Sequence, residues 1–234
     1  MGAGGTPTQT QNGEKRAAWA LAPIAATVGY YSLPLSLQED PIVQFSPQLV
    51  AYLGFIYWAS GNTTILPRLG LGRAAIWIGC RWGLMTGLIL GGLNTLVILL
   101  FFPSMGYDIT FLKTTPHGRV PPLAMVPWFI GFIAVAVEIN FRGFLLGRLA
   151  TIESRWQRSP AIQRILPLSL LASTLTFAFD PFLVNTFRHL HWIAVWDGLI
   201  WGTIRLRTGN LYTTIVAHGV EVTIMYLAVK AAIG

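Results

Sequence analysis

The amino-acid sequence predicts an all-α fold, a multi-pass transmembrane helical bundle of about seven spans. Of the 234 residues, 53% are hydrophobic and only 11% are charged, whereas a soluble domain usually carries about 25% charged residues. The apolar residues form long runs separated by short polar gaps, and the Lys and Arg residues lie mostly in those gaps. Lipid is therefore the expected solvent for most of the surface.

The chain begins with a polar segment. Residues 1–16 (MGAGGTPTQTQNGEKR) are small and hydrophilic, which predicts a disordered tail. Residues 17–234 show no internal repeat and no domain boundary, and they are predicted to form a single membrane-embedded helical domain. The apolar run from Ala17 to Leu37 is too long for a signal-peptide core, so we expect an uncleaved first span.

Seven apolar runs predict the spans in order along the chain. A helix needs about 20 residues to cross a bilayer. The second, fifth and sixth runs are shorter than this, so we expect tilted or discontinuous helices there. The predicted spans cover residues 17–37, 43–60, 80–102, 121–146, 165–180, 192–206 and 211–231.

The basic residues predict the orientation of these spans. If the N-terminus is cytoplasmic, eleven Lys and Arg residues face the cytoplasm and four face the opposite side, as the positive-inside rule requires. The C-terminus is then expected on the opposite side. Because the positive charges are spread over the gaps and form no patch, membrane lipid is the expected partner and nucleic acid is not. The four residues of the outer side are Lys113, Arg119, Arg188 and Lys230.

Glycine recurs every four residues in the third predicted span, at Gly79, Gly83, Gly87 and Gly91. This spacing places the four glycines on one helix face, where a neighbouring helix can approach closely. The single cysteine, Cys80, excludes an intrachain disulfide and a thiolate metal site.

Four ionisable residues lie deep inside predicted spans, where each is costly unless it is paired or solvated. Glu138 and Arg142 are four residues apart, so they share a helix face and form either an ion pair or a site in which Glu138 activates water. His218 and Glu221 are three residues apart in the last span. His218 is expected to donate to an oxyanion or to bond a neighbouring helix, and Glu221 to pair with His218 or fill a polar gap.

Three stretches resemble motifs of the CAAX protease and bacteriocin-processing family of intramembrane proteases. The run VEINFRGFLLGRL (137–149) resembles its first motif, EExxxR, and LRTGNLYTTIVAHGVEV (206–222) resembles its last, an RTG turn followed by HxxxN or HxxxD. The run STLTFAFDPF (173–182) stands where the family has FxxxH. The resemblance covers roughly residues 70–230.

The resemblance implies a helical bundle with a site open inside the membrane, where glutamate and histidine side chains activate water. It implies a membrane peptide or a lipidated peptide as substrate, since eukaryotic members cleave prenylated C-terminal peptides. Carried over position by position, it makes Glu138, Arg142 and His218 the expected catalytic residues. The other three polar positions of the motifs carry Val137, Pro181 and Val222.

Nearby polar residues are candidate substitutes for the missing motif groups. Asp180 and Glu221 stand beside two of the altered positions, and His191 completes a literal FxxxH that begins at Phe187. His189 lies two residues from His191, a spacing that is poor for a two-ligand metal site on a helix. No cofactor is predicted, since Glu138 with His218 is too small a ligand set for zinc, although a divalent metal remains open.

Three functions therefore remain open from the sequence. The first is an intramembrane endopeptidase that uses glutamate-activated water. The second is a catalytically inactive relative that binds a membrane peptide or joins an assembly, because three of six polar motif positions are absent. The third is a proton-coupled transporter built around Glu138, Asp197 and Glu221.

Overall fold

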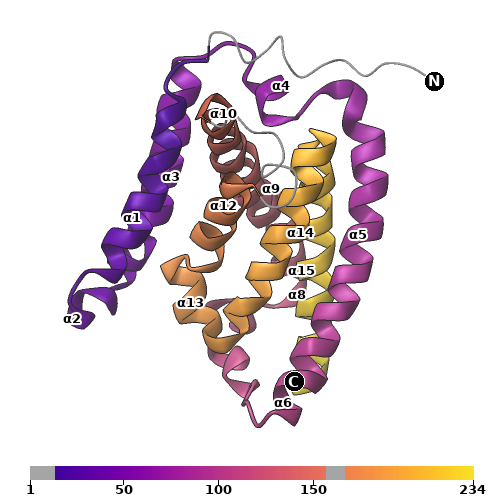
Figure 1. The fold of residues 1–234 in the computed structure, drawn as a ribbon. Helices are drawn as coiled ribbons and strands as arrows, with labels where there is room; N and C mark the ends of the chain where they lie inside the picture. Colours follow the sequence, from indigo (N-terminus) through magenta and orange to yellow (C-terminus); the bar gives the residue numbers. More distant parts are fainter. Residues whose placement is uncertain (1–13, 157–166) are drawn as a thin grey trace.

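The computed structural model describes residues 14–156 and 167–234, and these two stretches are helical without a β-strand (Figure 1). Residues 1–13 of the predicted tail and the first two residues of the fifth predicted span lie outside them. The α-helices are α1 (Leu21–Tyr31), α2 (Leu35–Gln38), α3 (Pro41–Ser60), α4 (Ile65–Leu69), α5 (Ile76–Leu96), α6 (Phe102–Ser104), α7 (Pro116–Arg119), α8 (Pro122–Trp128), α9 (Ala134–Glu138), α10 (Gly147–Trp156), α12 (Leu168–Ala178), α13 (Pro181–Phe187), α14 (Ile193–Thr208) and α15 (Leu211–Ile233).

Short segments of other helix types join these elements. The 3-10 segments are Ala17–Ala20, Arg73–Ala75, Thr110–Thr114 and Arg188–Trp192, and the π-helical segments are Val97–Phe101, Phe129–Ile133 and Ile139–Leu146.

Three continuous helical stretches in the described residues are long and apolar enough to cross a membrane: Ile65–Ser104, Pro122–Arg155 and Leu211–Ile233. A fourth crossing arises if Leu168–Ala178 and Pro181–Thr208 count as one span, because this pair passes the same test with a bend of 52°. The all-α membrane bundle is thus confirmed, while the number of seven spans stays a prediction. The fifth and sixth predicted spans are the two arms of the bent pair.

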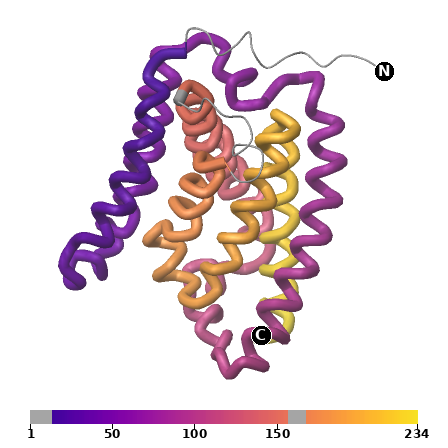
Figure 2. Tube along the Cα trace, in the orientation of Figure 1, coloured from indigo at the N-terminus to yellow at the C-terminus, as the bar shows by residue number. Residues whose placement is uncertain are grey.

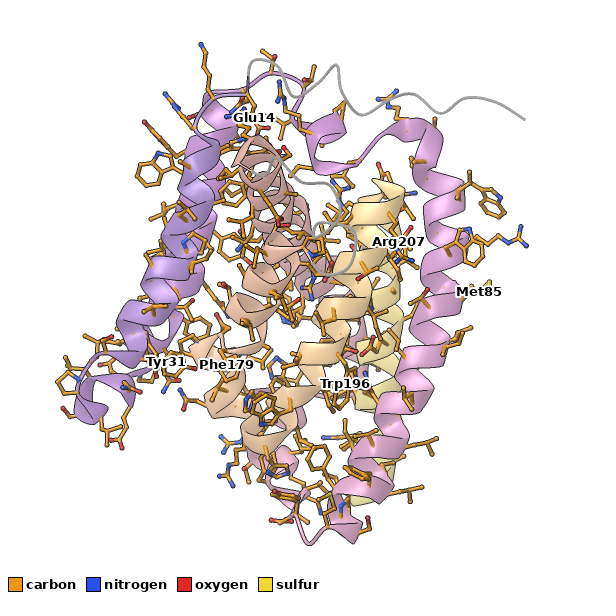
Figure 3. The ribbon with its side chains drawn as sticks, viewed as in Figure 1. Glu14, Tyr31, Met85, Phe179, Trp196 and Arg207 are labelled. Carbon is orange, nitrogen blue, oxygen red and sulfur yellow. The ribbon has the colours of Figure 1, made fainter. Side chains whose placement is uncertain are left out.

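Large apolar side chains cover the outside of the bundle. On α5, Trp77 is 77% exposed and Met85, which points away from the neighbouring helices in Figure 3, is 45% exposed. Leu49 on α3 and Leu123 on α8 are exposed in the same way. A soluble protein rarely presents apolar surface on this scale, so these side chains indicate contact with lipid.

Helices α5 and α15 run side by side along one flank of the bundle (Figures 1 and 2). A Cβ atom added at Gly83 would lie 2.6 Å from the carbonyl oxygen of Thr213, and one added at Gly87 would lie 2.7 Å from that of Ala217. The predicted close approach at the glycine face is therefore confirmed. It brings α5 directly against the helix that carries His218.

The α1–α3 hairpin stands at the opposite flank (Figure 1). The hydroxyl of Tyr31 in α1 donates to the carbonyl oxygen of Phe179 after α12 at 2.9 Å, and both residues are labelled in Figure 3. Trp58 of α3 packs on Phe144, with ring centroids 5.7 Å apart. These contacts hold the hairpin against the helices that form the interior.

Candidate intramembrane site

A cavity of about 640 Å³ lies inside the bundle and is lined mainly by apolar and aromatic side chains. Its wall is formed by residues from α3, α7, α8, α9, α12, α13, α14 and α15 and from the 3-10 and π-helical segments that join them. Its ionisable lining side chains include Asp180 before α13, His191 of the 3-10 segment, Asp197 of α14, and His218 and Glu221 of α15. A few polar groups in an otherwise apolar hollow are typical of a ligand-binding or catalytic site.

Glu138 stands at the end of α9, where the helix changes to a π-helical segment that carries Arg142. Arg142 Nη1 lies 3.2 Å from Glu138 Oε1, so the predicted ion pair is present. His218 Nδ1 of α15 lies 3.0 Å from the same oxygen. The Glu138 side chain is 0% exposed, and among the described residues it is Val137, not Glu138, that forms this part of the cavity wall.

The guanidinium group of Arg142 is held between two aromatic rings. Its Cζ atom lies 4.1 Å from the ring centroid of Phe177 and 5.2 Å from that of Trp201. The aromatic faces and the Glu138 carboxylate together stabilise a charge that has no contact with water. Arg142 therefore fixes the carboxylate from behind and does not reach the cavity.

His218 is the member of this group that lines the cavity. Its ring stacks on Trp201 with centroids 4.7 Å apart and an interplanar angle of 27°. Because the Glu138 carboxylate accepts the bond, Nδ1 is the donor, and in the neutral imidazole Nε2 keeps its lone pair. Glu138 thus sets both the orientation and the tautomer of the imidazole.

A second polar group joins α5, α14 and α15. Asn94 Nδ2 lies 3.1 Å from Asp197 Oδ1 and 2.5 Å from Glu221 Oε1. The amide oxygen of Asn94 accepts from Trp196 Nε1 at 2.9 Å. Of the two alternatives expected for Glu221, the hydrogen bond with His218 is not formed: His218 Nδ1 is bonded to Glu138, and Glu221, which is 0% exposed, accepts from Asn94.

The other candidate substitutes also reach the cavity. Asp180 caps α13 by accepting from Leu183 N at 3.3 Å, and Gln48 Nε2 donates to it at 2.8 Å. His191 lines the cavity, whereas His189 turns away and stacks on Tyr107 with centroids 4.6 Å apart. The separation of the two histidines agrees with their different predicted faces.

Residues 119–224 match the family model of Rce1-like type II CAAX prenyl endopeptidases. Over these residues, which we call the CAAX-type segment, the chain is similar to the CAAX-type endopeptidase family. No curated protein and no solved structure matches the chain.

The CAAX-type segment holds Glu138, Arg142, His218, Asp197 and Glu221, so the family match covers most of the polar side chains described above. The side chains at the three altered motif positions are all apolar. Val137 and Val222 line the cavity, and Pro181 is buried as the first residue of α13.

Two residues of the site lie outside the CAAX-type segment and were missed from the sequence. Asn94 follows Gly91 by three residues on the glycine face of α5, a polar position on a packed helix face that gave a usable signal. His117 belongs to the short helix α7 and lines the cavity, and burial lowers its pKa from the ordinary value of 6.5. No motif or spacing marks His117.

The described side chains contain no group of three or more His, Cys, Asp or Glu that is arranged to hold a metal ion. The site offers an imidazole backed by a carboxylate and, on the same cavity wall, two carboxyl groups joined by the amide of Asn94. Such a set can move protons at a molecule in the cavity.

Proposed function

We propose that the protein is a CAAX-type intramembrane endopeptidase-like hydrolase that cleaves a membrane peptide or a lipidated peptide inside the cavity. The observation that carries this proposal is His218, which lines an apolar cavity and is backed by a fully buried carboxylate at 3.0 Å. This pairing resembles the orienting carboxylate and base of other hydrolases, where the imidazole accepts the proton of the attacking group.

The proposal gives the role of general base to His218 and not to Glu138. Glu138 is bonded to both Arg142 and His218 and lies behind Val137, so a water in the cavity meets the imidazole first. His218 Nε2 accepts a proton from the water, and the hydroxide oxygen forms a bond to the carbonyl carbon of the substrate. Glu138 stabilises the imidazolium that results.

Collapse of the tetrahedral intermediate breaks the carbon–nitrogen bond and requires a proton for the leaving amine. Asp197 and Glu221 are suited to supply it, because carboxyl groups this close together share a proton. Asn94 binds both groups and holds them at the cavity wall. His218 then passes the proton that it took from the water to the Asp197–Glu221 pair, which restores both groups. The products are a carboxylate and an amine, and the atoms of one water molecule are divided between them.

The size and polarity of the cavity support a peptide with an apolar anchor. Its wall is lined largely by Phe, Ile, Leu and Val side chains, including Phe141 and Phe177, whose ring centroids lie 5.1 Å apart. A hydrocarbon chain or an apolar peptide segment is stabilised by such a wall, and it excludes bulk water from the reacting bond.

A second candidate function is binding without hydrolysis. It is favoured by Val137 and Val222, which place apolar side chains on the cavity wall where the family motifs have polar groups. In this case the cavity would hold the same class of peptide, and Glu138, Arg142 and His218 would stabilise the bundle.

We also propose a cytoplasmic N-terminus, on the basis of the eleven basic residues that the sequence assigns to that side. Protease digestion of sealed vesicles that carry an N-terminal epitope tests this orientation. The epitope is expected to be removed only when the cytoplasmic face is accessible.

Hydrolysis in oxygen-18 water separates the two functions. The reconstituted protein is incubated with a prenylated C-terminal peptide, and the products are identified by mass spectrometry. An endopeptidase releases a shortened peptide whose new carboxylate contains one oxygen-18 atom. A peptide that binds the protein and remains intact supports the binding function and overturns the hydrolase.

A further inference from the structure

Three arginine side chains gather at the end of the bundle where α4, α10 and the last turn of α14 lie, at the top of Figure 1. Arg148 Nη2 donates to the carbonyl oxygen of Arg68 at 3.3 Å. The guanidinium group of Arg205 lies against Gly70, two residues after Arg68, and its charge acts on that of Arg148. We call Arg68, Arg148 and Arg205 the arginine cluster.

The carboxylate of Glu14 is inserted into this cluster. Glu14 Oε1 lies 2.7 Å from Arg148 Nε, and Glu14 Oε2 lies 3.5 Å from Arg68 Nη1. Trp58 Nε1 donates to Glu14 Oε1 at 2.7 Å. Donors from α3, α4 and α10 therefore converge on one anion, and the Glu14 side chain is only 2% exposed.

The floor of this anion site is aromatic. The guanidinium group of Arg148 lies over the ring of Trp58, with Cζ 4.5 Å from the ring centroid. Stacking fixes the plane of Arg148, and the same indole ring offers its N–H to the anion. Trp58 of α3 therefore fixes the geometry of the site, which exposed and flexible lysine side chains would not do.

Glu14 does not satisfy the whole cluster. Arg148 Nη1 and Arg205 Nε are buried and have no hydrogen-bond partner among residues 14–156 and 167–234. A carboxylate has one negative charge and two oxygens, whereas three guanidinium groups carry three positive charges. Phosphate oxygens are more numerous, carry more charge and match the planar fork of arginine.

We infer that the arginine cluster with Trp58 is a binding site for a phosphate group, and that Glu14 occupies it as an internal substitute. The chemistry is that of a phospholipid headgroup or of free phosphate. Basic residues at the ends of membrane-spanning helices lie at headgroup level, which makes an anionic phospholipid the expected source. Arg68 lies at the open edge of the site, with 11% of its side chain exposed.

The test uses the full chain in nanodiscs of phosphatidylcholine, with and without phosphatidylglycerol, and a third sample in phosphatidylcholine with added inorganic phosphate. Tm and lipid bound in native mass spectrometry are measured. Phosphatidylglycerol is expected to raise Tm of the unaltered protein. Glu14→Gln removes the competing charge and is expected to tighten phosphatidylglycerol binding about tenfold, the change that one charge-assisted hydrogen bond supplies.

Arg148→Gln is expected to abolish the response to phosphatidylglycerol. Arg207→Gln is the matched control, because Arg207 is an exposed arginine at the same end of α14 (Figure 3) and lies outside the cluster. This variant should respond as the unaltered protein does. A general attraction between basic residues and anionic lipid would instead weaken both variants equally, which contradicts a built site.

The three samples identify the source of the phosphate. A rise in Tm with phosphatidylglycerol alone assigns the site to a headgroup, and an equal rise with inorganic phosphate assigns it to the free anion. The inference is overturned if neither raises Tm. If Arg148→Gln fails to fold, Glu14→Gln decides: binding that is equal to or weaker than that of the unaltered protein overturns the inference.

Discussion

His218 Nδ1 lies 3.0 Å from Glu138 Oε1, although 80 residues separate the two along the chain. The contact joins the last helix to the turn between α9 and its π-helical continuation. Of Glu138, Arg142 and His218, only His218 lines the cavity, so the buried ion pair contacts the cavity only by way of the imidazole.

Removing the carboxylate of Glu138 is expected to destabilise the protein strongly. Glu138→Ala leaves the buried charge of Arg142 unpaired, so we expect the free energy of unfolding to fall by about 3–5 kcal/mol. Adding Arg142→Met to the same chain removes that charge and should restore part of the loss. Denaturant titration in detergent measures both variants. A double variant no more stable than Glu138→Ala would contradict the ion-pair assignment.

Removing the amide of Asn94 is expected to destabilise the contact between α5, α14 and α15. Asn94→Ala leaves the carboxyl groups of Asp197 and Glu221 without their shared donor, so the free energy of unfolding should fall by about 1–3 kcal/mol. Leu93→Ala is the matched control, since Leu93 is the neighbouring position and is 50% exposed on the lipid side. Equal losses for the two variants would show that Asn94 has no special role.

The glycine face of α5 allows a direct comparison of two Gly→Ala changes. At Gly87 the new Cβ would lie 2.7 Å from the carbonyl oxygen of Ala217, whereas at Gly92 nothing lies within 4 Å. We expect Gly87→Ala to destabilise by about 1–3 kcal/mol. Gly92→Ala should stabilise by about 0.5–1 kcal/mol, the helix-propensity gain of alanine. Unfolding titrations decide, and equal effects would contradict the close approach of α5 to α15.

His117 is expected to make stability depend on pH. Burial lowers the pKa of His117 below its ordinary value of 6.5, so the unfolded chain binds more protons than the folded chain just below that pH. The free energy of unfolding should therefore fall as pH falls through 6.5 towards the folded pKa. In His117→Phe this part of the pH dependence should disappear. Tm measured across this range tests it, and identical profiles for both proteins would refute the contribution.

Parts of the fold were predictable from local spacing. Glycines four residues apart predict one packed helix face. That face lies directly against α15, because glycine has no Cβ atom that would hold the two backbones apart. Glu138 and Arg142 are one turn apart, so their ion pair also followed from helix geometry. The amino-acid composition predicted the membrane bundle, because the share of apolar and charged residues shows whether most of the surface faces lipid or water.

The span count was less predictable, because hydropathy does not register a bend. Asp180 precedes Pro181, and a residue before proline avoids helical conformation, so α12 ends there and α13 begins with Asp180 as its cap. The helices on either side of this break are bent by 52° relative to each other. Hydropathy therefore predicts two separate spans where the structure has one bent pair.

Most of the site is formed by contacts between helices that are far apart in the sequence. Asn94 meets Asp197 across 103 residues and Glu221 across 127 residues, and no periodicity within one helix encodes such a contact. The motif resemblance led to Glu138 and His218. It did not indicate that Val137 would form the cavity wall in place of Glu138, because that depends on how the π-helical segment Phe129–Ile133 rotates the turn that follows it.

Single-turnover cleavage of a prenylated C-terminal peptide by liposome-reconstituted protein tests the role of His218 most directly. His218→Asn keeps an N–H for Glu138 but removes the base, so we expect the unaltered protein to cleave and the variant to be slower by about 10²–10⁴-fold, with unchanged peptide affinity. His189→Asn is the control, because the His189 ring stacks on Tyr107. This variant should cleave the peptide as fast as the unaltered protein does. Equal rates for His218→Asn and the unaltered protein, or no cleavage by the unaltered protein despite peptide binding, would contradict hydrolysis by His218.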